Sequence, residues 1–285
     1  MMIVVTGATG QLGRLVVEGL LERVPAQELA VAVRSPEKAA AWAAHGVEVR
    51  EADYSRPETL AGAFRAGETV LLVSGSEVGS RIAQHTAVVD AAAAAGVARL
   101  VYTGVLGGDE ATFDLAAEHK ATEAAILASG LPYTFLRNGW YTENYTAGAA
   151  RAVERGTVLG SSGEGRIATA ARADYAAAAV AVLTGAGHEN RAYELSGDTA
   201  WNLGEYAAEL AAQSGRPVAY QHVAPAQHLD ALVGAGLPAG FAAVLVDVDA
   251  AILRGELDRD RGVLSTLIGR PTTPLADSVK AALGA

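Results

Sequence analysis

The chain of 285 residues contains no cysteine, and this absence removes several kinds of chemistry. Disulfide bonds, thiolate nucleophiles and cysteine-ligated zinc are all excluded. The six histidines are scattered, and no His-x-His or His-Glu-x-x-His pattern occurs among them. Because such patterns bring metal ligands together, we expect no metal site.

Positive charge is also scarce. Lysine and arginine together number 22, with only three lysines, against 32 acidic residues, and the formal net charge is −10. Nucleic-acid binding depends on basic patches that neutralise phosphates, so we expect no nucleic-acid partner. No apolar run reaches the roughly 20 residues of a membrane-spanning helix, and no charged leader precedes the first apolar run. We therefore expect a cytoplasmic protein without a membrane partner, and a homodimer is left open.

The first half of the chain is rich in short aliphatic runs that alternate with longer helical patterns. Amphipathic stretches such as Leu12–Arg23 and Ala83–Ala95 separate these runs. Continuous apolar strands between helices predict a parallel sheet that is covered on both faces. The expected fold is α/β, a Rossmann-like doubly wound parallel sheet with a smaller, mostly helical C-terminal lobe. The predicted strands are residues 2–6, 29–33, 47–50, 69–73, 98–103 and 132–136.

The first strand runs directly into the loop GATGQLG at residues 7–13, and a helical pattern follows. This is a G-x-x-G-x-x-G form of the dinucleotide-binding fingerprint. Gly7 permits the tight turn, Gly10 lets the backbone approach the pyrophosphate, and Gly13 lets the helix lie close to the sheet. The phosphates are expected at the helix N-terminus, where unpaired N–H groups and the helix dipole favour anions. The other predicted cofactor contacts in this loop are Ala8, Thr9, Gln11 and Leu12.

The end of the second strand indicates which dinucleotide binds. Folds specific for NAD place an acidic residue there, on the ribose 2′-hydroxyl. This chain has Arg34 instead, and Lys38 follows within one helical turn. A guanidinium fork suits a 2′-phosphate, so we expect NADPH as the cofactor. The alternative is that both are solvated surface charges, and Glu37 lies nearby.

Polar and small residues end the next strands, at the sheet edge where ligands bind in this architecture. Asp53 is placed to reach an adenine amino group, although a turn-forming aspartate explains it equally well. Ser74, Gly75 and Ser76 are small enough for the backbone to approach the cofactor. Thr103 ends the fifth strand and completes this set of predicted contacts.

After residue 137 the alternation changes. Residues 160–165 form a Gly/Ser loop, residues 172–187 a helical pattern and residues 191–197 a further strand, and helices dominate from residue 200 onward. We therefore expect an NADP-binding Rossmann domain over residues 1–150, to which residues 172–195 return. A substrate lobe is expected over residues 151–285, with an approximate and discontinuous boundary.

Several motifs together resemble a known family. They are TGATGQLG with Arg34 and Lys38, SGSEVG (74–79), AAGVARLVYTG (94–104), SGLPYTFLRNGWYTENY (129–145), RADYAAAA (172–179) and LIGRPTTPL (267–275). The chain resembles the atypical short-chain dehydrogenases of the NmrA-like group, and within it the bacterial NAD(P)H:quinone oxidoreductases of the type 2 class. This resemblance implies NADPH as cofactor, quinones as hydride acceptors, and no flavin.

The catalytic pair of ordinary short-chain dehydrogenases is incomplete. Those enzymes use Tyr-x-x-x-Lys, in which the lysine lowers the pKa of the tyrosine. Lys120 is present, but Ala116 stands four residues earlier. A ketone needs acid assistance when it is reduced, whereas a quinone yields a delocalised aromatic product. The missing tyrosine therefore favours quinone reduction, and it fits equally a protein that binds NADP(H) without turnover.

The stretch RNGWYTENYT, at residues 137–146, concentrates aromatic and amide side chains in a chain with 6% aromatic residues. It begins where the sixth predicted strand ends. Asn138, Gly139 and Trp140 are predicted cofactor contacts, with Trp140 also a candidate core anchor. Tyr141 and Asn144, three residues apart on a helical turn, would share a face. We predict that both contact the acceptor, that Tyr141 also contacts the cofactor, and that Lys120 completes the catalytic set.

Two other functions stay open. The first is a redox-sensing NADP(H)-binding regulator of the NmrA-like kind, which would act through a protein partner. The second is an NADPH-dependent reductase of dyes or similar conjugated compounds. His119, beside Lys120, could donate a proton, but we expect it at a helix surface.

Overall fold

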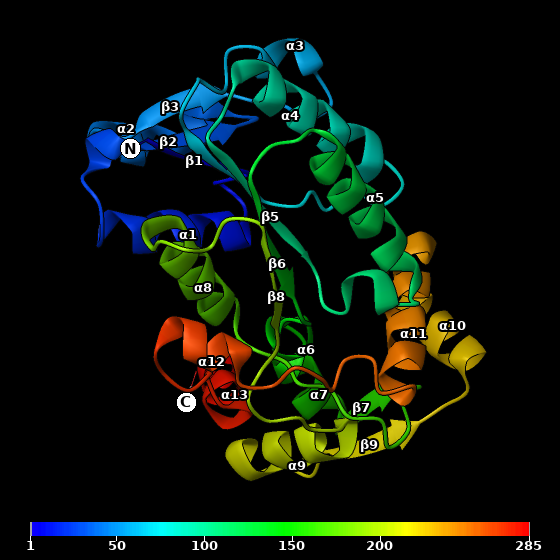
Figure 1. The fold of residues 1–285 in the computed structure, drawn as a ribbon. Coiled ribbons are helices and arrows are strands. Elements are labelled where there is room, and N and C mark those ends of the chain that lie inside the picture. The colour runs from blue at the N-terminus through cyan, green and yellow to red at the C-terminus, as the bar shows by residue number, and fades with distance from the viewer. Residues whose placement is uncertain (1, 285) are drawn as a thin grey trace. The chain divides into compact units, whose positions relative to one another are not determined.

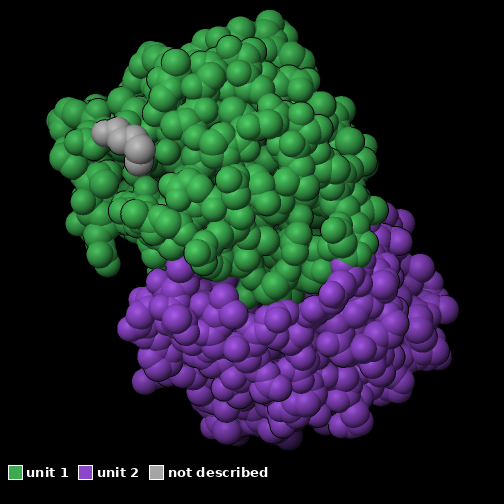
Figure 2. Space-filling view, in the orientation of Figure 1, with its two compact units in different colours: residues 1–109, 117–138, 172–194 green, residues 110–116, 139–171, 195–285 purple. Residues whose placement is uncertain are grey.

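The computed structural model describes residues 2–284; Met1 and Ala285, the end residues of the two predicted domains, lie outside them. Two compact units emerge, coloured separately in Figure 2. Unit 1 contains residues 1–109, 117–138 and 172–194, and unit 2 contains residues 110–116, 139–171 and 195–285. Since three segments alternate with three, the chain passes between the units five times.

Unit 1 is built on a seven-stranded sheet, counted over the described residues, with the order β3-β2-β1-β4-β5-β6-β8. Pairing is parallel from β3 through β6, so the predicted doubly wound α/β fold is confirmed. The strands are β1 Ile3–Thr6, β2 Leu29–Val33, β3 Glu48–Glu51, β4 Thr69–Leu72, β5 Arg99–Val105, β6 Tyr133–Asn138 and β8 Arg191–Leu195.

The sheet is covered by helices on both faces (Figure 1). On one face, the strand residues Val4, Leu100 and Tyr102 belong to the same buried cluster as Val88 of α4 and Ile126 of α5. Burial on two sides is why the inner strands β1, β2 and β4 are almost continuously apolar, in contrast to β3 and β8 at the sheet edges. The helices of this unit are α1 Gln11–Leu21, α2 Ala40–Ala44, α3 Pro57–Leu60, α4 Arg81–Ala95, α8 Arg172–Thr184 and most of α5 Asp114–Ala128, with short 3-10 turns at η1 Ala26–Glu28, η2 Pro36–Ala39 and η3 Gly108–Glu110.

Helices α1 and α8 pack against each other, and a glycine sets how closely they approach (Figure 1). A Cβ added to Gly19 would lie 3.0 Å from Cγ2 of Val180, so even alanine there would require the Val180 side chain or the helices to shift. Helix α8 thus returns to unit 1 and covers α1 after the chain has left it at residue 138.

Unit 2 is mostly helical, with a small parallel sheet of two strands, β7 and β9, among its described residues. The sequence did not indicate β9, because AYQH has mostly exposed side chains and no apolar alternation. None of the described helices has both the length and the apolarity that crossing a membrane requires. The elements of unit 2 are α6 Glu143–Thr146, α7 Ala149–Arg155, β7 Thr157–Gly160, α9 Leu203–Ser214, β9 Ala219–His222, α10 Pro225–Gly234, α11 Ala239–Leu253, α12 Val263–Ile268 and α13 Leu275–Leu283.

Candidate functional site

The glycine-rich loop between β1 and α1 has the tight geometry that its sequence predicts. Gly7 has a φ of +57°, a conformation that L side chains rarely adopt. Its N–H donates to the carbonyl of Ala32 at 3.1 Å, and its own carbonyl accepts from the Gly10 N–H at 2.9 Å. A Cβ added to Gly13 would lie 2.4 Å from the Gly7 oxygen and 2.8 Å from Cα of Ala8. Only glycine at residue 13 lets the helix start this close to the loop.

The N-terminus of α1 is open to an anion. Its first residue is preceded by Gly10, no side chain caps the helix, and no acidic residue lies in its first turn. The N–H groups of the first turn have no partner within the helix, and the helix dipole makes this end positive. Together with the Gly13 cradle, this arrangement fits a dinucleotide pyrophosphate.

Tyr54 contacts the strand ends next to the loop, and this role was not predicted from the sequence. Its hydroxyl donates to Oγ1 of Thr6 at the end of β1, and it also lies 3.1 Å from the carbonyl oxygen of Val73 after β4. Burial raises the pKa of Tyr54, so the phenol keeps its proton. The hydroxyl would be 3.7 Å from a Cβ on Gly7, which places this contact directly under the turn.

Arg34 and Lys38 lie where β2 ends, Arg34 directly after the strand and Lys38 on η2, and both are exposed. The Arg34 guanidinium is 3.4 Å from a carboxylate oxygen of Glu77, and both side chains are more than half exposed. An exposed pair at this distance is weak, so Arg34 can exchange this carboxylate for another anion.

Asp53 acts as a turn residue in this structure. One carboxylate oxygen accepts from the Ser55 N–H at 2.9 Å, and the other lies 3.2 Å from the Arg56 guanidinium. Desolvation opposes ionisation, but these contacts hold the pKa of Asp53 below its usual value. Asp53 therefore forms the turn that the alternative interpretation predicted. A contact with adenine would have to use the remaining lone pairs of the Asp53 carboxylate.

The residues after β4 are fixed from the neighbouring strand and from α4. Oγ1 of Thr103 accepts from the Ser74 N–H at 2.9 Å and lies 3.5 Å from the Ser74 hydroxyl oxygen. The Gly75 N–H donates to Nε2 of His85 at 2.9 Å. The predicted residues that follow β1, β3 and β4, together with Thr103 in β5 and Asn138 at the end of β6, thus share one edge of the unit 1 sheet. His85 was not predicted, because RIAQHTA is typical of a helix surface.

His119 is buried, and the expectation of a helix-surface position is wrong. Only 6% of it is exposed, and its Nδ1 lies 2.7 Å from the Tyr102 hydroxyl. Burial, with the nearby Arg81 charge, lowers the pKa of His119 to about 3. The same two causes lower the pKa of His85, which is completely buried, to about 3. Both imidazoles are therefore neutral at physiological pH.

These two histidines predict a loss of stability in mild acid. Between pH 6.5 and about 3 they bind protons in the unfolded chain but not in the folded one, so the free energy of unfolding falls as pH drops below 6.5. Each contributes up to about 1.4 kcal/mol per pH unit. Urea titrations between pH 7 and 5 measure the slope, and His119→Phe should lower it by about half. A flat profile over this interval would contradict the buried neutral state.

Two features mark the end of β6 in unit 1. Oδ1 of Asn138 is buried and has no hydrogen-bond partner among the described residues. Such an orphaned acceptor fits a ligand that brings a donor. Next to it, Arg137 donates twice to Glu123, at 2.9 and 2.7 Å, and once to Glu194 at 2.8 Å. The hydrogen bonds that Arg137 donates to Glu123, and then to Glu194, raise the pKa of Arg137 although desolvation opposes this.

The rest of RNGWYTENYT belongs to unit 2. The Trp140 carbonyl accepts from the Ala170 N–H at 3.4 Å, and Trp140 is only half-buried. The Asn144 N–H donates to the Tyr141 carbonyl at 3.0 Å, so these two residues are one turn apart. Tyr141 is half-buried and Asn144 exposed. The Gly139 N–H donates to the Leu195 carbonyl at 2.7 Å, which fixes the start of the turn.

Tyr145 explains part of the concentration of aromatic side chains in residues 137–146. Its ring stands edge-on to Trp201, with centroids 4.9 Å apart, and lies 6.0 Å from Tyr206. The Tyr206 hydroxyl donates to the Tyr145 carbonyl at 3.0 Å. Tyr145, half-buried like Tyr141, thus anchors the turn against the aromatic rings of unit 2, whereas Asn144 is exposed.

Lys120 lies on α5 and is half-buried. Ala116, at the position of the missing tyrosine, is buried. The structure brings the cofactor candidates of unit 1 to one sheet edge, whereas Lys120 lies on a covering helix.

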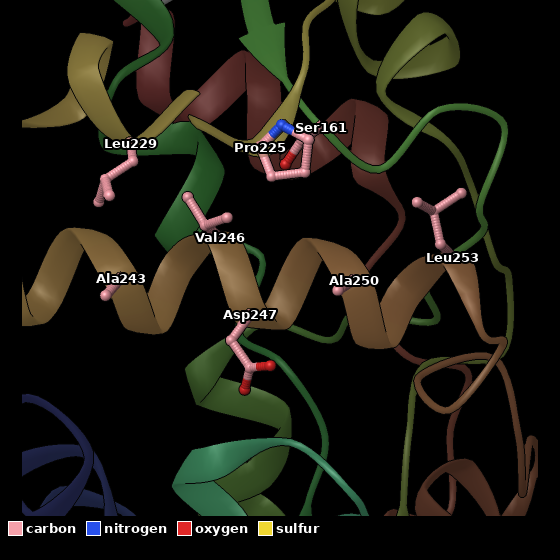
Figure 3. A pocket seen from close by; sticks show the side chains of 8 residues that line it. All are labelled: Ser161, Pro225, Leu229, Ala243, Val246, Asp247, Ala250 and Leu253. Carbon is pink, nitrogen blue, oxygen red and sulfur yellow. The ribbon is translucent and has the colours of Figure 1, made fainter. Parts of the chain in front are cut away.

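Unit 2 contains an apolar pocket of about 320 Å³ that none of the predicted site residues lines (Figure 3). Its wall is mainly α11, with Pro225 and Leu229 from α10 and with Ser161. Ser161 Oγ lies 3.1 Å from Nδ1 of His228 and 3.0 Å from Oδ2 of Asp249, and the same Nδ1 lies 3.1 Å from that carboxylate. In a catalytic triad, the serine and the carboxylate contact different ring nitrogens of the histidine. Here both lie near Nδ1 of His228, so we assign this cluster a structural role.

Comparison with known proteins agrees with this geometry. A family model described as NAD(P)H-binding matches residues 7–186. Quinone oxidoreductase 2 of Escherichia coli (strain K12) is 51% identical over 278 residues, which cover 98% of this chain and 97% of that protein.

Two solved structures are similar over almost the whole chain. The crystal structure of an NADPH-dependent quinone oxidoreductase from Escherichia coli, complexed with NADPH, has a TM-score of 0.96, 50% identity, and coverage of 99% of this chain and 100% of that one. The triphenylmethane reductase of Citrobacter sp. complexed with NADP(H) has a TM-score of 0.94 and 41% identity, with coverage of 98% and 99%. This chain therefore belongs to the NAD(P)H-binding family.

Proposed function

We propose that this chain transfers a hydride from NADPH to quinones directly, without flavin or metal, and that it acts in the cytoplasm. The observation that carries the proposal is the 51% identity, along 98% of the chain, to quinone oxidoreductase 2 of Escherichia coli. The open α1 N-terminus, the Gly13 cradle and the orphaned Asn138 acceptor support a dinucleotide cofactor.

NADPH, when bound, supplies the hydride, and unit 1 contains most of the residues that we propose hold and orient it. The α1 N-terminus and the loop from Gly7 to Leu12 would take the pyrophosphate. Arg34 and Lys38 would take the 2′-phosphate, for which Arg34 gives up its weak contact with Glu77. The remaining proposed contacts are Asp53, Ser74, Gly75, Ser76, Thr103, Asn138, Gly139, Trp140 and Tyr141.

The acceptor needs little acid assistance from the chain. A hydride and a solvent proton convert a quinone into a hydroquinone, and the charge that develops on oxygen is delocalised over an aromatic ring. A tyrosine with a lowered pKa is therefore unnecessary, which agrees with Ala116 at its position. Orientation of the two flat reactants then supplies much of the rate. We propose that Tyr141 and Asn144 provide this orientation, with Lys120 as the third member.

Turnover of a panel of benzoquinones and naphthoquinones, followed by NADPH oxidation, tests the function. We expect activity with several quinones and no change on adding flavin. The same panel should include triphenylmethane dyes, because the similar Citrobacter protein is named for their reduction. Turnover of dyes alone would favour the dye reductase. NADPH binding without turnover of any acceptor would favour a regulator and count against the proposal.

Removal of the proposed acceptor contacts should lower turnover and leave NADPH binding intact. We expect Asn144→Ala to reduce kcat/KM for quinones roughly tenfold, the value of one or two neutral hydrogen bonds. Tyr141→Phe should have a smaller effect, since the ring is kept. Steady-state kinetics with both substrates measure this. The assignment falls if both variants turn over quinones as the unaltered protein does.

Loss of the Arg34 guanidinium should change cofactor preference. Charge-assisted bonds to a phosphate are worth about 1.5–3 kcal/mol, so Arg34→Ser should weaken NADPH binding roughly 10- to 100-fold. NADH lacks the 2′-phosphate, and its affinity is the internal control, which should hardly change. Equal losses for both cofactors would mean that Arg34 shapes the site instead of binding the phosphate.

A further inference from the structure

The loop from Ser74 to Gly79, here the 74–79 loop, is held by charged and polar side chains. It leads from β4 to α4, and Gly75 is its most constrained residue. The Gly75 N–H donates to Nε2 of His85 at 2.9 Å, and the Gly75 carbonyl accepts from Nε of Arg81 at 2.8 Å. Two buried side chains of α4 thus hold both peptide groups of one glycine.

The far end of the loop is held in a similar way. The Gly79 N–H donates to one carboxylate oxygen of Glu118 at 2.8 Å, and the other accepts from Arg81 at 2.7 Å. Arg81 is 5% exposed and Glu118 9%. A buried ion pair is a poor source of stability, because desolvating both charges offsets most of the attraction. Stability therefore does not explain this buried ion pair between Arg81 and Glu118. Its effect is to fix the shape of the 74–79 loop.

His85 connects the loop to α5 through hydrogen bonds that can run in only one direction. The Gly75 N–H can only donate, so Nε2 of His85 must accept. At the other end, the Thr122 hydroxyl donates to the Glu118 carbonyl at 2.8 Å, which can only accept. Nδ1 of His85, 2.9 Å from that hydroxyl oxygen, must therefore carry the proton. Two backbone groups fix the tautomer, and a doubly protonated imidazole would break the Gly75 contact.

We propose that His85 is a positioning residue for NADPH, which holds the Gly75 peptide so that the 74–79 loop keeps the shape required for binding. The inference rests on the proposed function, in which Ser74, Gly75 and Ser76 contact the cofactor. A loop rich in glycine and serine loses much conformational freedom when it is ordered. Ordering it before the cofactor arrives removes that cost from the binding step.

Three variants separate this role from general stability. His85→Phe keeps an aromatic ring but removes the acceptor. His85→Gln keeps an acceptor for Gly75 and a donor for Thr122. His119→Phe is the matched control, because it removes another buried imidazole that contacts Tyr102 instead of the loop. Circular dichroism checks that each variant folds, and should His85→Phe not fold, His85→Gln against His85→Met carries the comparison.

Two measurements are needed, namely the Kd of NADPH by fluorescence and the hydrogen–deuterium exchange of residues 74–79 without cofactor. For His85→Phe we expect the exchange rate and the Kd each to rise about tenfold, and kcat at saturating NADPH to stay within about twofold. His85→Gln should restore both quantities toward the original values. His119→Phe should change neither.

Three results would overturn the proposal. The first is unchanged exchange and Kd in His85→Phe, and the second is the same changes in His119→Phe. In the third, the unaltered protein binds no NADPH, and the proposed function then fails as well. If the unaltered protein binds NADPH but reduces no quinone, only the proposed function fails, because exchange and Kd still report on His85.

Discussion

Replacing Gly13 by valine should abolish NADPH binding. The first atom of any side chain there would lie 2.4 Å from the Gly7 oxygen, 2.8 Å from Cα of Ala8 and 3.0 Å from the Gly7 carbonyl carbon. All three are backbone atoms, so no rotamer change can relieve the overlap. Either the loop or the start of α1 must move, and the N–H groups that face the pyrophosphate move with it. We expect affinity for NADPH to fall at least a hundredfold, or about 2.7 kcal/mol.

Two further glycine variants show whether the loss has this cause. A Cβ on Gly10 would meet only the Gly7 oxygen, at 3.1 Å, so Gly10→Ala should weaken binding less. A Cβ on Gly62 would meet nothing within 4 Å, so Gly62→Ala should bind NADPH normally. Fluorescence titration gives all three Kd values. Near-normal binding by Gly13→Val would show that the cradle tolerates a shifted helix, contrary to the dinucleotide interpretation.

Replacing Arg137 by leucine should cause a large loss of stability in unit 1. The guanidinium, 18% exposed, neutralises Glu123 and Glu194, whose side chains are 8% and 22% exposed. Without it, two nearby carboxylates remain with no counter-charge in a partly dry site. Removal of one partner of such a network costs about 3–5 kcal/mol at neutral pH. Urea denaturation at pH 7 measures the difference.

The pH dependence identifies the cause of that loss. The cost of carboxylates without a counter-charge disappears once the carboxylates are protonated. The deficit of Arg137→Leu should therefore shrink as pH falls below about 5. Arg14→Ala is the matched control, because its ion pair with Glu18 is about half exposed and adds little. A deficit that does not change with pH would point to lost packing of the arginine stem instead.

The fold was predictable where one local pattern determines one structure. β1, β2 and β4 are apolar except for one threonine each in β1 and β4, and all of their residues are buried, so their sequences leave few alternatives. β9 was not predictable, because AYQH has no distinguishing pattern and pairs with β7, some 60 residues earlier in the chain. The strand conformation of β9 depends on its pairing with β7, and the residues next to β9 in the sequence do not indicate that pairing.

The candidate site likewise contains some residues that were predictable from the sequence and others that were not. Gly7, Gly10 and Gly13 were found because backbone geometry demands glycine at fixed spacing. Tyr54 and His85 were missed, since their roles arise only when separate strand ends meet. His119 was placed wrongly for a related reason. Histidine on a helix is usually at the surface, and here the Tyr102 hydroxyl of β5 gives the buried ring of His119 a hydrogen-bond partner.

The threading of the chain between the two units has a consequence for its synthesis on the ribosome. Unit 1 needs residues 172–194, which emerge only after residues 139–171 of unit 2. Until then, the part of α1 around Gly19 lacks the covering helix α8, and the sheet lacks β8. A nascent chain that has reached residue 150 therefore presents an unfinished sheet and an apolar helix face to chaperones. Both units become complete only late in translation, and a gene fragment that ends at the apparent domain boundary encodes neither of them.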